Sequence, residues 1–99
     1  MALLFPATGP AREVKPATGD AFTLQELQGI VGGYLEALRA PDDRVMFLNE
    51  DGKRLELPRN DKATALGWAA GTLSTFDVIV GDVIVCTLVE AGETGEPEE

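Results

Sequence analysis

The chain has 99 residues, with eight basic and 17 acidic side chains, one cysteine and no histidine. This length predicts one domain that buries about two thirds of its unfolded surface without metal or disulfide support. The lack of histidine excludes Ser-His-Asp triads and histidine general bases, and it leaves zinc without a ligand set. A net charge of −9 repels phosphate backbones and anionic membranes, so we expect no direct nucleic-acid or membrane partner.

Aromatic residues make up only 6% of the chain, which predicts a core of aliphatic side chains. Cys86 lies within an apolar run and is expected to act as a small buried hydrophobe, in a chain suited to a reducing cytoplasm. The apolar opening is stopped by Pro6 and is too short for a signal peptide, so we expect neither secretion nor membrane insertion.

The first predicted elements are two short strands, at residues 3–5 and 12–15, which form a hairpin around the turn at 8–10. A helix is predicted to follow Thr23, which can cap it with Glu26 as its capping-box partner. Phe22 and Leu27 are placed to pack on each other as a hydrophobic staple, and Gly32-Gly33 ends the helix.

The middle of the chain predicts a second hairpin. Residues 34–39 look extended, 41–43 form a turn, and 44–48 are an apolar strand. Residues 49–52 resemble a tight turn, and residues 53–57 alternate leucine with charged side chains. We therefore expect 44–48 and 53–57 to pair.

Pro58 ends this hairpin, and Asn60 is a favourable N-cap for a helix that starts at Asp61 and reaches residue 66, 68 or 70. After a loop at 71–75, residues 78–80 and 83–89 read as extended segments joined by a corner at Gly81-Asp82.

These elements predict a small α+β domain over residues 1–89: a mostly antiparallel sheet of about five strands, with two short helices on one face. Residues 90–99 are rich in glutamate and are expected to form a disordered acidic tail. Apolar strands at the sheet edges favour pairing between chains, so we expect a homo-oligomer.

Two adjacent acidic pairs lie at predicted turns, where acidic side chains accept local backbone hydrogen bonds. This holds for Asp42-Asp43 and Glu50-Asp51, and a turn or capping role is also favoured for Asp77 and Asp82. The segment 49–52 lacks the spacing of a calcium loop. No catalytic residue, metal or cofactor is therefore predicted.

One segment has the character of an anion site. The amides at the start of the second helix, near Asn60, can receive a phosphate together with Arg59, Lys62 and Thr64, although the charge of Asp61 opposes this. Trp68 is suited to stacking on a base or anchoring a protein interface, with core packing as the alternative.

Four segments in order carry a family resemblance: Val31-Gly-Gly-Tyr-Leu-Glu36, Asn49-Glu-Asp-Gly52, Leu57-Pro-Arg-Asn60 with Ala63-Thr64-Ala65, and the run from Asp77 to Val85. Over about residues 2–88 the chain resembles an uncharacterised family of short phage, prophage and plasmid proteins. The resemblance implies a mobile-element accessory protein in the bacterial cytoplasm, with no catalytic residues to transfer. Its matching ligand positions are Asn49, Glu50, Arg59, Asn60 and Thr64, in two turns expected to converge.

Our first hypothesis is a non-enzymatic protein that counters host defence by binding and withholding a small nucleotide signal. The alternative is an acidic inhibitor that occupies a basic surface of a host nucleic-acid enzyme or defence protein. An enzyme that uses Asp77, Asp82 or a bound metal is a third possibility.

Overall fold

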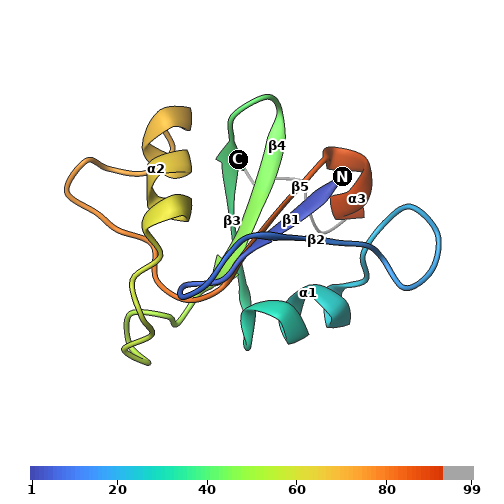
Figure 1. Ribbon diagram of the computed structural model, residues 1–99, viewed down its shortest axis with the longest axis horizontal. Coiled ribbons are helices and arrows are strands. Elements are labelled where there is room, and N and C mark those ends of the chain that lie inside the picture. Colours follow the sequence, from blue (N-terminus) through green and yellow to red (C-terminus); the bar gives the residue numbers. More distant parts are fainter. Residues whose placement is uncertain (93–99) are drawn as a thin grey trace.

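The computed structural model describes residues 1–92 as one five-stranded antiparallel sheet with three helices (Figure 1). The strands lie in the order β2-β1-β5-β4-β3. Their bounds are Ala2–Phe5 for β1, Arg12–Val14 for β2, Leu35–Ala40 for β3, Arg44–Asn49 for β4 and Val83–Cys86 for β5. The helices are α1 (Leu24–Val31), α2 (Asp61–Ala70) and α3 (Leu88–Ala91). The α+β prediction is confirmed. No helix within these residues is long and apolar enough to cross a membrane.

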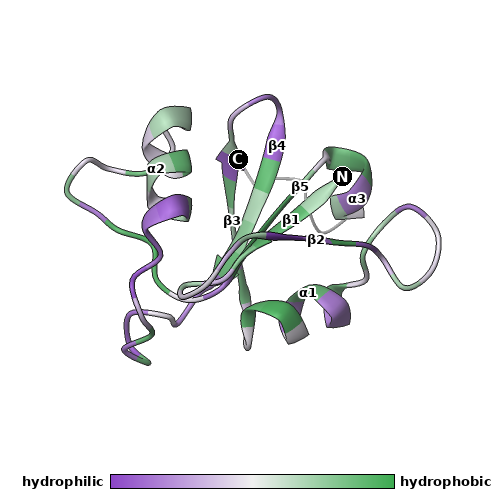
Figure 2. Ribbon diagram, viewed as in Figure 1, coloured by the Kyte–Doolittle hydropathy of each residue, from purple (hydrophilic) through white to green (hydrophobic). Residues whose placement is uncertain are grey.

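The two longer helices lie on opposite faces of the sheet, so the prediction that both cover one face is wrong. Figure 1 shows the sheet close to edge-on, with α2 on one side and α1 and α3 on the other. The cause is the central strands β4 and β5, whose apolar residues are consecutive rather than alternating, so both of their faces must be covered. Figure 2 shows the same pattern as hydrophobic colour through the middle of the sheet and hydrophilic colour at several of the loops.

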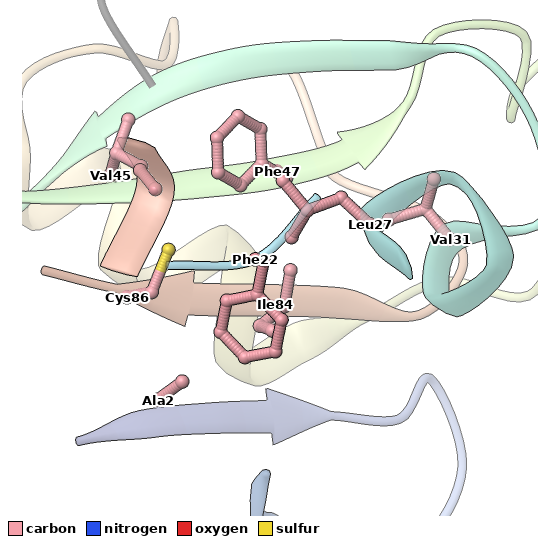
Figure 3. Packing of buried hydrophobic residues seen from close by; sticks show 9 residues of the cluster. Ala2, Phe22, Leu27, Val31, Val45, Phe47, Ile84 and Cys86 are labelled. Carbon is pink, nitrogen blue, oxygen red and sulfur yellow. The ribbon is translucent and has the colours of Figure 1, made fainter. Parts of the chain in front are cut away.

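The α1 side holds the larger core cluster. Phe47 of β4 and Ile84 of β5 are fully buried there, against Phe22 and Leu27. Figure 3 shows these side chains pointing into the space between the sheet and α1, with Cys86 beside them. The expected role of Cys86 as a buried hydrophobe is confirmed.

The α2 side has a second cluster, in which Met46, Val83 and Val85 lie beneath the helix. Gly67 brings α2 close to the loop that follows it, because a Cβ there would lie 2.9 Å from the Cβ of Leu73. This close approach fixes where the loop after α2 leaves the helix.

The capping box predicted for α1 is confirmed. Thr23 accepts a hydrogen bond from the Glu26 amide at 3.1 Å, and the Glu26 carboxylate accepts one from the Thr23 amide at 2.9 Å. The second Glu26 oxygen accepts from the Ala17 amide at 2.8 Å, which ties the preceding loop to the helix. Phe22 and Leu27 are both buried in the cluster on this side, as the staple requires.

The Glu26 carboxylate predicts a pH dependence of stability. Hydrogen bonds from the Thr23 and Ala17 amides lower its pKa below the usual 4.5. A lowered folded pKa contributes stability above pH 4.5 that is lost as the pH falls through the folded value. We expect Glu26→Gln to reduce the difference in unfolding free energy between neutral and acidic pH, measured by urea denaturation. An unchanged difference would remove Glu26 as a contributor.

The predicted pairing of 44–48 with 53–57 is wrong. β4 pairs with β3 on one edge and with β5 on the other, so no edge is left for a third strand. Residues 50–56 form consecutive turns instead, closed by local backbone bonds such as Leu57 N to Gly52 O at 3.0 Å. The second hairpin of the sheet is β3–β4, whose turn contains Asp42 and Asp43, both with positive φ.

The C-terminal strand is shorter than predicted. β5 ends at Cys86, because Thr87 caps α3 with Glu90 as its capping-box partner. The corner at Gly81 is confirmed, with φ +81° and its amide donating to Pro58 O. The expected tail starts at residue 90, yet Glu90 and Ala91 belong to α3, and residues 93–99 lie outside the described part.

Candidate functional site

Asn60 holds three segments together. Its side chain accepts from the Ala63 amide at 3.1 Å as the N-cap of α2, and its amide group donates to Phe5 O at 2.8 Å and to Gly81 O at 2.9 Å. The residue is 1% exposed. The helix start predicted from sequence is confirmed, and the polar atoms expected to face a ligand are occupied within the protein.

Thr64 is engaged in the same way. Its hydroxyl donates to Asn60 O at 2.7 Å and accepts from the Ile79 amide at 2.8 Å. Ile79 is part of the core cluster on this face. Thr64 therefore joins the first turn of α2 to the segment that leads into β5.

Arg59 and Lys62 are the exposed members of the predicted anion site. The Arg59 guanidinium lies 2.6 Å from an Asp61 carboxylate oxygen, so the two form an exposed ion pair. The backbone of Arg59 forms an isolated antiparallel bridge with Val80. The opposing charge of Asp61, noted in the sequence, thus acts directly on the arginine meant to receive the anion.

The other predicted turn contributes one buried and one exposed residue. Asn49 is buried, donates to Val31 O at 3.2 Å and accepts from the Asp51 amide at 2.8 Å. Glu50 is exposed and lines a hollow of about 120 Å³ together with Asn49, Lys53 and Asp77.

The two predicted turns meet the same segment without forming one site. Gly52 approaches Val80, and the Asn60 amide donates to Ile79 O at 2.8 Å. None of the residues expected to bind a ligand on the α2 side lines the hollow beside Glu50. The expected convergence therefore brings the backbones together but not the candidate side chains.

Trp68 is 40% exposed, and its indole N–H donates to Ser74 O at 2.9 Å and Asp77 O at 3.2 Å. It thus fastens the loop between α2 and β5. That loop presents Phe76, which is 99% exposed and is a candidate that the sequence analysis did not select. No periodicity marks a single phenylalanine in a loop as exposed or buried.

A comparison with protein-family models shows the family of the chain, because one model matches residues 2–99. The chain belongs to the DUF3846 family. This family is described as a domain of unknown function, which agrees with the resemblance to an uncharacterised family. No curated protein and no solved structure matches the chain.

Of the two aspartates considered for catalysis in this DUF3846 chain, Asp77 has the local turn role favoured from sequence, whereas Asp82 bonds to the distant segment after β1. Asp77 accepts from the Val78 amide at 2.8 Å and pairs with Lys53, and the Lys53 hydrogen bond is the main cause of its lowered pKa. Asp82 accepts from the Ala7 amide at 3.0 Å. Within residues 1–92, no three His, Cys, Asp or Glu side chains gather as they would around a metal.

The single thiol of this DUF3846 chain supplies a probe of folding. Burial raises the pKa of Cys86 to about 12, so the native thiol is protonated and shielded at neutral pH. We expect an aromatic disulfide reagent to label Cys86 only after unfolding, at a rate that follows the unfolding equilibrium. Rapid labelling of the native protein would show that β5 opens without global unfolding.

Proposed function

We propose that this protein is a non-enzymatic acidic inhibitor that docks on a basic surface of a bacterial nucleic-acid enzyme. In this proposal it is a mobile-element accessory protein of the host cytoplasm that acts against host defence. The supporting observation is where the polar groups point. Asn60 and Thr64, at the predicted nucleotide site, form their side-chain hydrogen bonds to other groups of the protein. Most carboxylates among residues 1–92 are exposed to solvent instead.

The charge distribution fits this role. Three basic side chains of the described residues form ion pairs with aspartates: Lys53, Arg54 and Arg59. Several carboxylates are exposed and form no ion pair among the described residues: Glu13, Asp20, Glu36, Asp42, Asp43, Glu50, Glu56 and Asp82. Such a surface attracts a cationic partner and speeds its association.

Binding of a nucleotide signal is less well supported than this docking. Arg59 is paired with Asp61, which also adds a negative charge at the end of α2 where a phosphate would bind. Calorimetry with linear and cyclic nucleotides separates the two proposals. Heat that disappears in Arg59→Ala would favour the nucleotide signal over the inhibitor.

Inhibition assays test the proposal directly. The protein would be titrated into purified bacterial nucleases and polymerases at low and at high salt. We expect inhibition of at least one enzyme that weakens as salt rises, because contacts between exposed charges are screened. Asp42→Asn with Asp43→Asn, compared with Glu13→Gln, would locate the face involved. A panel without inhibition at low salt would contradict the proposal.

Self-association stays a proposal, supported by the free edge of β3. Glu50 N donates to Tyr34 O, and the alternation of an antiparallel pair then directs the backbone groups of Leu35, Ala37 and Arg39 outward. Thr72 donates to Arg39 O at 2.7 Å and covers one end of this edge. Native mass spectrometry at several protein concentrations measures whether the remaining edge pairs.

A further inference from the structure

Phe76 is the most exposed large apolar side chain among the described residues. At 99% exposure it gains nothing from burial in the folded chain. It lies in the loop between α2 and β5, which projects from the side of the molecule opposite α1 and α3 (Figure 1). A fully solvated phenylalanine at a projecting loop suits an interface better than it suits the fold.

The turn that carries Phe76 is fixed on both sides. Asp77 N donates to Ser74 O at 2.9 Å, which closes a four-residue turn, and the Trp68 indole bonds to the carbonyls of both Ser74 and Asp77. The Asp77 carboxylate is held in turn by the Val78 amide and by Lys53. Because the turn is already ordered, the backbone around Phe76 loses little conformational freedom when a partner binds.

A negatively charged hollow lies directly beside this turn. Asp77 and Leu73, from the same loop, line it together with Glu36 and Glu50. The Lys53 ammonium pairs with the Asp77 carboxylate, so the net negative charge of the hollow comes from Glu36 and Glu50. Its volume of about 120 Å³ is that of roughly four waters, enough for the end of one long side chain. A lysine or arginine is the side chain that this charge favours.

We propose that Phe76 is the apolar anchor of a docking surface, and that the hollow beside it receives a basic side chain of the same partner. The partner is a protein segment that presents apolar side chains together with a lysine or arginine. This inference rests on the proposed inhibitor function and adds the contact that makes an acidic surface selective. A second copy of the chain is disfavoured at this surface, because the hollow is itself acidic and calls for a basic side chain, whereas the chain carries a net charge of −9.

Selection from random linear peptides tests the anchor without a known enzyme. Peptides would be displayed, selected on the wild-type protein and then synthesised. We expect the selected peptides to combine apolar residues with lysine or arginine, and to change the emission of Trp68, the only tryptophan in the chain. Phe76→Ala should weaken their binding about tenfold or more, as for a central anchor.

Two control variants complete the design. Val89→Ala removes apolar surface from exposed α3 and should leave peptide binding unchanged. Glu36→Gln with Glu50→Gln should weaken binding and reduce its dependence on salt. Absence of selected peptides, peptides without basic residues, or equal binding by Phe76→Ala would each overturn the docking surface. If peptides bind at Phe76 but no enzyme of the panel is inhibited, the docking surface stands and the inhibitor function fails.

Discussion

Asn60→Ala is expected to leave the protein barely folded at room temperature. The substitution removes the N-cap of α2, worth about 1 kcal/mol. It also removes the donors to Phe5 O and Gly81 O, and a buried carbonyl without a donor costs about 1–3 kcal/mol. The sum over the cap and the two carbonyls, about 3–7 kcal/mol, approaches the whole stability of a small domain. Urea denaturation followed by Trp68 fluorescence measures it.

Asn60→Ser is the matched control, because serine caps helices well but is too short to bond both distant carbonyls. We expect Asn60→Ser to recover about 1 kcal/mol of the loss and no more. The difference between the variants then isolates capping, and the remaining deficit belongs to the bonds that join the β1 end, the α2 start and the β5 corner. A serine variant as stable as the wild type would show that those bonds contribute nothing.

The elements governed by local chemistry were predictable from sequence. The capping box of Thr23 and Glu26, the Asn60 cap and the corner at Gly81 each depend on residues within a few positions of one another. Strand pairing depends on the whole sheet. Residues 53–57 alternate as a strand does, yet both edges of β4 are taken by β3 and β5.

The sequence does contain a pattern that indicates helices on both faces of the sheet. Residues 44–48 and 83–86 contain runs of consecutive apolar residues, which indicate strands buried on both sides. Two helices on one face would have left Met46 and Val85 facing water. The same reasoning identifies residues 53–57, which carry charges at alternate positions, as poor candidates for the sheet interior.

The candidate site was less predictable, since one residue type serves both capping and ligand binding. A polar side chain at a helix start accepts amide hydrogens from its own helix as readily as it frames an anion site, and Asn60 does the former. Phe76 lacked any local signal. Its exposure depends on how Trp68 and Lys53 fix the turn at Asp77, through contacts from residues nine and 24 positions away in the sequence.

Phe47→Ala and Phe76→Ala make the same chemical change at the two extremes of burial. Phe47 is fully buried between the sheet and α1, so its truncation should cost about 3–5 kcal/mol of unfolding free energy through lost transfer energy and a residual cavity. Phe76 is 99% exposed, so its truncation should change stability by no more than about 0.5 kcal/mol. Thermal and urea unfolding of both variants measure the contrast. A large loss of stability in Phe76→Ala would make Phe76 a structural residue. Unchanged stability, together with weakened peptide binding, leaves recognition as the role of its ring.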